Sequence, residues 1–263
     1  NFLELQHYCS KKEIKFFSTA FDLPSIDFLN KIGLDRFKIP SGEITNLPYL
    51  RHIGRLNKPI IMSTGMATLK EINDALHILV ESGMDRTEIT VLHCTTEYPA
   101  PINEVNLNAM LTIKNELGVR VGYSDHTLPS YNMINLTTAF MLGAKVIEKH
   151  FTNDKKLKGN DHYHSMDKDD LKTLIKNIKK INQITGKTIS KKVLRCETKS
   201  RKFARRSIVV EKKIYKNQII TNDNIIALRP NIGISVDMWD KVIGKRAKKD
   251  LKKHHSLSMK DLY

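Results

Sequence analysis

The chain has 263 residues, of which 40% are hydrophobic and 27% are charged, and its formal net charge is +16. This composition is typical of a globular protein and excludes a disordered or fibrous chain, and the length suits one large α/β domain with or without a small second one. No apolar run approaches the ~20 residues of a membrane-spanning helix, so we expect no membrane segment. We find no signal peptide, although Asn1 stands where a natural start would carry Met.

Half of the excess positive charge lies in residues 187–206, which hold nine Lys and Arg residues against one Glu, a net of +8. A nucleic-acid-binding patch is one interpretation of such a segment. A solvated basic linker fits better, because the segment carries no series of aromatic residues for base stacking. We therefore expect no nucleic-acid partner.

The three cysteines, Cys9, Cys94 and Cys196, are odd in number and show no C-x-x-C spacing. This pattern argues against a disulfide framework and against a cysteine zinc site. It favours a reducing compartment, and we expect the protein to be cytoplasmic.

Strand-like and helix-like segments alternate along residues 1–186, after a helix-like start at residues 2–10. The alternation gives six strand–helix units with no hairpin signal among them. This pattern predicts a parallel sheet with right-handed crossovers. The expected strands cover residues 13–21, 35–42, 59–64, 88–95, 121–127 and 145–151, and the expected helices cover residues 22–32, 47–56, 68–82, 107–117, 128–144 and 168–185.

An open doubly wound sheet and a closed (β/α)8 TIM barrel both fit this alternation. The barrel is favoured because no G-x-G-x-x-G motif follows the first strand, and because polar residues recur after nearly every strand. A barrel has eight strands, so six units predict that two N-terminal units are missing from this sequence. Beyond this partial barrel (1–186), the basic linker (187–202) leads to 203–263, where the alternation stops and short β-like pieces predict a small second domain.

Two histidines, His126 and His150, stand at the ends of two consecutive predicted strands. The carboxyl ends of neighbouring parallel strands lie on the same side of a sheet, so both imidazoles can reach one divalent metal ion. Glu148 lies two residues before His150 and therefore points to the same side of its strand. It either orients a metal ligand or pairs with another group inside the barrel.

Nine collinear segments resemble the sialic acid (N-acetylneuraminate) synthase family, and together they span nearly the whole chain. The resemblance implies a (β/α)8 barrel followed by a C-terminal SAF (antifreeze-like) domain. It also implies a homodimer in which that small domain covers the partner's barrel. The segments are FFSTAFD (16–22), FKIPSGEITNLPYL (37–50), IIMSTGMATLKEI (60–72), LHCTTEYPAP (92–101), NLNAM (106–110), VGYSDHT (121–127), GAKVIEKHFTNDKKLKGNDH (143–162), ARRSIVV (204–210) and RPNIGIS (229–235).

The reaction that the resemblance implies condenses phosphoenolpyruvate with the open-chain aldehyde of an N-acylated hexose, typically N-acetylmannosamine, and releases phosphate. A divalent metal is required, most often Mn²⁺, with Mg²⁺ or Co²⁺ as alternatives. His126 and His150 match the metal ligands, and two protein ligands leave positions open for water and the sugar. Lys38 and Glu148 complete the predicted catalytic set.

The resemblance also assigns substrate contacts. A trianionic substrate needs a cation and several donors, which Lys38 and nearby hydroxyl groups supply. Glu43 is placed at the site and can contact substrate or pair with Lys38, and the His162-x-His164 pair is interpreted as no more than a detail of the sugar loop. The matched positions for phosphoenolpyruvate are Thr19, Lys38, Ser41, Ser63, Thr96 and Ser124, and those for the sugar are Tyr98, Asp161 and, from the small domain to the other subunit, Arg229.

Three alternatives stay open. A 2,4-diacetamido-6-deoxyhexose as acceptor would give legionaminic or pseudaminic acid, and HTLPS (126–130) departs from the family's usual H-T-x-G beside the sugar. A heptulosonate or octulosonate synthase is a rival, which the small C-terminal domain disfavours. The last is a catalytically silent barrel that acts as a binding protein, which the intact His126, His150, Lys38 and Asp161 disfavour.

Overall fold

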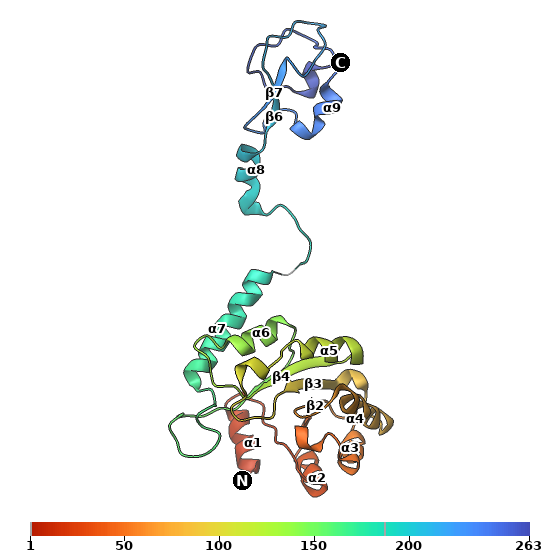
Figure 1. Ribbon diagram of the computed structural model, residues 1–263, viewed down its shortest axis with the longest axis vertical. Helices are drawn as coiled ribbons and strands as arrows, with labels where there is room; N and C mark the ends of the chain where they lie inside the picture. The colour runs from red at the N-terminus through yellow and green to blue at the C-terminus, as the bar shows by residue number, and fades with distance from the viewer. Residues whose placement is uncertain (1, 187) are drawn as a thin grey trace. The chain divides into compact units, whose positions relative to one another are not determined.

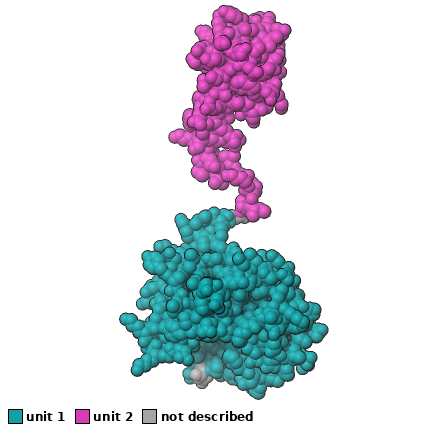
Figure 2. Space-filling view, in the orientation of Figure 1, with its two compact units in different colours: residues 1–186 teal, residues 187–263 magenta. Residues whose placement is uncertain are grey.

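The computed structural model describes residues 2–186 and 188–263. Lys187, the first residue of the predicted basic linker, lies outside them. The chain divides into two compact units, residues 1–186 and 187–263, which Figure 2 shows in different colours. None of the helices in the described ranges combines the length and apolar character that crossing a membrane requires.

The first unit is built on one parallel sheet whose five strands follow each other in chain order, β1-β2-β3-β4-β5. Helices connect the strands, as the alternation in the sequence predicts, and Figure 1 shows them packed around the sheet. The strands are β1 (Phe37–Ile39), β2 (Ile60–Ser63), β3 (Ile89–Cys94), β4 (Arg120–Asp125) and β5 (Ile147–Lys149), and the helices are α1 (Phe2–Lys11), α2 (Leu23–Lys31), α3 (Leu47–Gly54), α4 (Leu69–Glu81), α5 (Ala109–Leu117), α6 (Ile134–Met141) and α7 (Lys168–Thr185).

Capping side chains set where the helices begin. Asp22 caps α2 by accepting a hydrogen bond from the Ser25 backbone N–H. A capping box opens α4, in which the Thr68 hydroxyl and the Glu71 carboxylate each accept from the other's backbone N–H. Asp167 opens α7 in the same way.

The core lies between the sheet and its helices. Strands β1 and β2 are buried along their whole length, as is usual where helices cover a parallel sheet. Alternate strand residues such as Phe37, Val91 and Tyr123 pack with helix residues such as Leu76 in one continuous apolar cluster. The remaining strand residues therefore face the other side of the sheet.

The sheet is strongly curled, as in a (β/α)8 barrel. Its edge strands β1 and β5 are four strand spacings apart, which in a flat sheet would be about 19 Å. Nevertheless, the Lys38 ammonium on β1 lies 3.3 Å from the Glu148 carboxylate on β5. The concave face thus brings side chains from distant strands into contact.

One predicted strand, at residues 13–21, is wrong. The structure forms only an isolated parallel bridge between Thr19 and Lys38 there, so five strands replace the predicted six. The segment has a sheet neighbour on one side only, and its apolar residues Ile14 and Phe17 are exposed. Without a buried face, alternating apolar residues do not stabilise a strand.

The second unit has its own apolar core, which includes Ile208, Val210, Ile220 and Leu257. Its short strands β6 (Ser207–Val210) and β7 (Ile225–Leu228) are antiparallel. They are followed by the one-turn helix α9 (Trp239–Val242). The basic segment before them is not an irregular linker throughout, because α8 (Thr198–Ala204) occupies part of it.

Candidate active site

The two faces of β4 and β5 carry different kinds of polar groups. Ser124 and Glu148 are register partners on the concave face, where the Ser124 hydroxyl donates to Glu148 Oε1 at 2.7 Å. Asp125 and Lys149 are the next register partners and point to the opposite face. His126 and His150 come one residue later and return to the concave face.

The outward-facing pair is a buried and fully bonded ion pair. Lys149 Nζ lies 2.9 Å from Asp125 Oδ2, and both side chains are almost completely buried. The Tyr123 hydroxyl donates to Asp125 Oδ1 at 2.9 Å, and Lys149 also donates to the Thr127 carbonyl. Burial and the Asp125 charge raise the pKa of Tyr123, so the phenol stays protonated. This network fixes the strand ends that carry the two histidines.

The concave face offers a cation and several hydroxyl groups. Lys38 is only 6% exposed, and its ammonium pairs with Glu148. The Ser63 and Thr96 hydroxyl oxygens are buried and have no hydrogen-bond partner among the described residues. Because buried hydroxyls are normally bonded, two open ones beside a lysine are typical of a site that takes an anion.

Gly65 lies between two hydroxyl groups of this face, those of Ser41 and Thr96. Its backbone N–H donates to Ser41 Oγ at 2.9 Å. A Cβ at this position would collide with Thr96 Oγ1 and lie 3.0 Å from Ser41 Oγ. Only glycine allows this close approach.

Two further predicted residues lie at the edge of this set. Thr19 is half-buried and bridges to the Lys38 backbone. Glu43 accepts a hydrogen bond from Asn46 Nδ2 at 2.6 Å, at the start of α3. The pairing of Glu43 with Lys38 that the sequence allowed is not formed, because Glu148 across the curled sheet takes that place.

His126 is oriented to use one particular ring nitrogen. Its Nδ1 lies 2.7 Å from the Thr95 carbonyl oxygen, which can only accept, so Nδ1 carries the proton. The Nε2 lone pair is left for another partner, which is how metal-binding histidines are usually held. Burial lowers the pKa of His126 and favours the neutral ring.

A third histidine joins the predicted pair. The ligand atoms of His150, Asp161 and His164 all lie within 4.8 Å of one another. The rings of His126 and His150 have centroids 5.4 Å apart, and those of His150 and His164 are 5.0 Å apart. Burial and the neighbouring His150 lower the pKa of His164. His164, which the sequence analysis assigned to the sugar loop, thus lies beside the predicted metal ligand His150.

Tyr98 lies beside all three imidazoles. Its ring centroid is 4.1 Å from that of His126, 5.8 Å from that of His150 and 5.6 Å from that of His164. Its backbone carbonyl accepts from the Tyr163 hydroxyl at 2.9 Å. The predicted sugar contacts Tyr98 and Asp161 are therefore next to the predicted metal ligands, whereas Arg229 belongs to the second unit, where it is exposed directly after β7.

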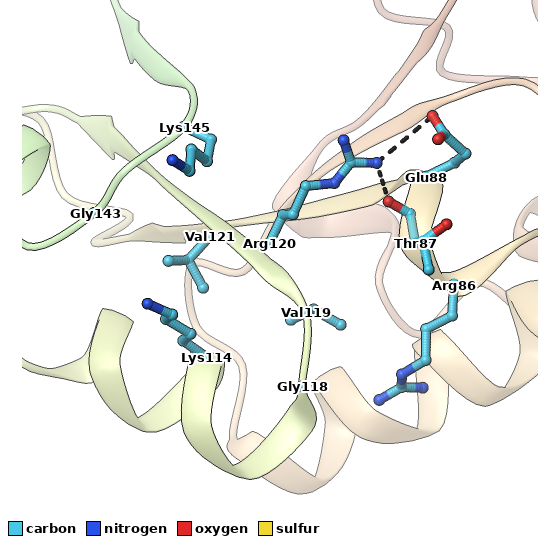
Figure 3. Close-up of a pocket in the computed structure, with 10 residues that line it drawn as sticks. All are labelled: Arg86, Thr87, Glu88, Lys114, Gly118, Val119, Arg120, Val121, Gly143 and Lys145. Carbon is cyan, nitrogen blue, oxygen red and sulfur yellow. Dashed lines mark hydrogen bonds and ion pairs between the residues drawn. The ribbon is translucent and has the colours of Figure 1, made fainter. Parts of the chain in front are cut away.

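A cavity of about 690 Å³ lies at the other end of the strands, where β3 and β4 begin (Figure 3). Its two arginines are engaged. Arg120 bonds to the Thr87 carbonyl and pairs with Glu88 at 3.5 Å, and Arg86 donates to the Leu117 carbonyl at 2.7 Å. No histidine, cysteine or serine among the described residues lines it, and in parallel barrels the active site lies at the carboxyl ends of the strands.

The sheet is parallel and curled, and its concave face carries a lysine and hydroxyl groups next to a histidine cluster. These features are typical of a (β/α)8-barrel enzyme. The chain belongs to the NeuB family, whose model matches residues 1–190, and a SAF domain model matches residues 205–262. The predicted partial (β/α)8 barrel, which the described residues form as a curled parallel sheet of five strands, and the C-terminal SAF domain are thereby confirmed.

Individual relatives agree with this assignment. The chain is 50% identical over 249 residues to N,N'-diacetyllegionaminic acid synthase of Campylobacter jejuni, covering 95% of this chain and 73% of that protein. A structure assigned as spore coat polysaccharide biosynthesis protein E from Chromobacterium violaceum matches with a TM-score of 0.82 at 25% identity, over 99% of this chain and 77% of that one. N-acetylneuraminic acid synthetase from Leptospira borgpetersenii matches with a TM-score of 0.68 at 32% identity, over 76% and 67% of the two chains.

Proposed function

We propose that this protein is a nonulosonic acid synthase that condenses phosphoenolpyruvate with an N-acylated hexose and water, releasing phosphate. One observation carries the proposal. A buried lysine and unbonded buried hydroxyl groups lie on the same concave face, and at the same strand ends, as a cluster of three histidines. The first set suits a phosphorylated carboxylate, and the second suits the activation of a carbonyl group.

Phosphoenolpyruvate would bind over Lys38, Ser41, Ser63 and Thr96. The Lys38 ammonium supplies the positive charge, and the three hydroxyls donate to phosphate or carboxylate oxygens. Because Ser63 and Thr96 have no partner of their own, the anion satisfies them without breaking an existing bond. Glu148 holds both the Lys38 ammonium and the Ser124 hydroxyl, and so orients them toward the substrate.

The histidine cluster fits a divalent metal ion. His126 is fixed with Nδ1 protonated and Nε2 open, and His150 lies beside it with the Asp161 carboxylate 3.8 Å from its Nδ1. A set of imidazoles and a carboxylate suits Mn²⁺ or Co²⁺ better than Mg²⁺, which prefers oxygen ligands alone. When bound, the ion would act as a Lewis acid on the aldehyde oxygen of the sugar.

The rest of the chemistry consists of positioning. Lys38 and the hydroxyls hold phosphoenolpyruvate so that its C3 faces the aldehyde carbon, and the new carbon–carbon bond forms there. Water is consumed as phosphate leaves, with one of its protons ending on the former aldehyde oxygen and the other on phosphate. Tyr98 lies against His126 and can cover the sugar side of the site.

Relatives guide the choice of acceptor. We place a 2,4-diacetamido-6-deoxyhexose first, because the relative at 50% identity is an N,N'-diacetyllegionaminic acid synthase. N-acetylmannosamine is the second candidate, because the Leptospira relative is an N-acetylneuraminic acid synthetase at 32% identity. We also propose a homodimer in which Arg229 of the SAF domain reaches the sugar in the partner's barrel, as the sequence resemblance implies.

Phosphate release by the full-length protein tests the proposal. Phosphoenolpyruvate and Mn²⁺ would be supplied with each acceptor in turn, and His150→Ala would be compared with His52→Ala, a histidine that pairs with Asp27 on the helical surface. We expect release that depends on the acceptor, is lost in His150→Ala and is retained in His52→Ala. Metal binding without release for any acceptor would instead support the silent binding barrel.

A further inference from the structure

His164 is the most unusual buried polar side chain in the described part of the molecule. It is completely buried, and neither of its ring nitrogens has a hydrogen-bond partner among the described residues. Burying an imidazole without a partner is unfavourable, and such groups in native proteins usually meet a water molecule or an ion. By contrast, His162 in the same loop is bonded to the Thr152 hydroxyl at 2.8 Å.

The surroundings of His164 consist of possible metal ligands. Its Nε2 lies 3.9 Å from Asp161 Oδ1, and His150 Nδ1 lies 3.8 Å from Asp161 Oδ2. Imidazole nitrogens bind first-row metals at about 2.0–2.1 Å, which places the rings of two ligands roughly 5 Å apart. The His150 ring is 5.0 Å from that of His164 and 5.4 Å from that of His126, close to this spacing. The ligand atoms of His150, Asp161 and His164 all lie within 4.8 Å of one another, and His126 stands next to this group.

Packing alone does not explain the residue. The His164 ring lies against Tyr163 at 5.0 Å and Tyr98 at 5.6 Å, contacts that a phenylalanine would also make. A phenylalanine would bury no unbonded nitrogen. The feature that distinguishes histidine here is therefore its ligating atoms, which are within reach of Asp161 and His150.

We propose that His164 is a third imidazole ligand, which joins His126 and His150 around the same divalent ion. The proposal rests on the proposed function only for the presence of that ion. A third nitrogen ligand favours Co²⁺ and Zn²⁺ over Mg²⁺ and leaves fewer positions for water. Asp161 then completes the site or orients the two rings beside it.

Direct metal titration of the full-length protein tests this proposal without any substrate. Mn²⁺ and Co²⁺ would be titrated by calorimetry into the wild type, His164→Phe, His164→Ala and the loop control His162→Gln. We expect both His164 variants to bind at least about tenfold more weakly, since even residues behind the ligands change affinity by that factor. His162→Gln should bind like the wild type. Unchanged affinity in a folded His164→Phe would overturn the proposal.

X-ray absorption of the Co²⁺-loaded wild type gives an answer that does not depend on how the variants fold. Three imidazoles in the coordination shell are expected, and two would contradict the assignment of His164. The result is also independent of catalysis. A three-imidazole ion in a protein that releases no phosphate would leave this inference intact while removing the proposed function.

Discussion

The outward face of the curled sheet and its concave face, with the loops at the strand ends, differ in how completely their buried polar groups are hydrogen-bonded. On the outward face, Asp125 and Lys149 are buried and bonded to each other and to Tyr123 and Thr127. On the concave face, Ser124 and Lys38 bond to Glu148, but the hydroxyls of Ser63 at the end of β2 and of Thr96 after β3 are buried without partners among the described residues. Both nitrogens of His164, in the loop after β5, are likewise buried and unbonded there. Successive residues of the same strands alternate between the two faces.

This difference indicates which polar groups stabilise the fold and which are available to bind a ligand. A buried polar network in which every group is bonded stabilises a fixed arrangement. Buried donors and ring nitrogens without partners destabilise the free protein, and a ligand that bonds to them recovers that free energy. The outward face should therefore respond to mutation mainly in stability, and the concave face mainly in binding and catalysis.

The largest effect on stability is expected for Lys149→Met. Removing one partner leaves the Asp125 carboxylate buried and unpaired, which should lower the free energy of unfolding by about 3–5 kcal/mol. Urea denaturation measures this change. The exposed pair of Lys172 and Asp169 supplies the control, since Lys172→Met should cost no more than about 1 kcal/mol. Equal losses in the two variants would refute the supporting role of the outward face.

Lys38→Met should affect catalysis instead. The Lys38 ammonium is the main cation of the concave face, and its loss should reduce kcat/KM for phosphoenolpyruvate by about 10²–10³-fold. The free energy of unfolding should change far less than in Lys149→Met, because Glu148 is partly exposed and keeps its bond to Ser124. Steady-state kinetics and denaturation of the same preparation check both expectations. A variant with normal kcat/KM would remove Lys38 from the site.

A smaller effect is expected for Ser63→Ala. The hydroxyl has no partner in the free protein, so its removal should leave stability unchanged or slightly raised. The dissociation constant for phosphoenolpyruvate should rise by about tenfold, because one hydrogen bond to a charged group contributes about that much affinity. Equilibrium binding and thermal melting separate the two readouts. Lower stability with unchanged binding would show that the hydroxyl is structural.

The smallest effect concerns pH and the outward face. His93 Nε2 lies 2.7 Å from the Val105 carbonyl oxygen, and burial lowers the pKa of His93. The unfolded chain therefore takes up a proton more readily, so stability is highest above the usual histidine pKa of about 6.5 and falls below it. His93→Gln should reduce that slope by up to about 1.4 kcal/mol per pH unit. Urea midpoints at several pH values measure it, and an identical slope in the variant would contradict the neutral state of His93.

Periodicity predicted most of the fold from the sequence. Regular alternation located the five strands, and the helices predicted at 22–32 and 168–185 begin within one residue of α2 and α7. The failure at residues 13–21 has a physical cause, since apolar alternation does not reveal whether a neighbour exists to bury it. Only the Thr19 bridge remains of that expected strand.

The site was predicted less completely. The spacing of His126 and His150 follows from strand geometry, and so does the inward direction of Glu148. The contact between Glu148 and Lys38 does not, because it depends on the curl of the whole sheet. His164 lies in an irregular loop without periodicity, and its signals in the sequence were the His162-x-His164 spacing and a position three residues after Asp161.

The fate of the carbon atoms of phosphoenolpyruvate tests the central claim most directly. The full-length protein would receive phosphoenolpyruvate labelled with ¹³C at all three carbons, a divalent metal and a 2,4-diacetamido-6-deoxyhexose or N-acetylmannosamine, and products would be identified by mass spectrometry. A nine-carbon keto acid carrying three labelled carbons, absent with His150→Ala, is the predicted result. Label found only in pyruvate or in unreacted phosphoenolpyruvate, with every acceptor, would contradict the account.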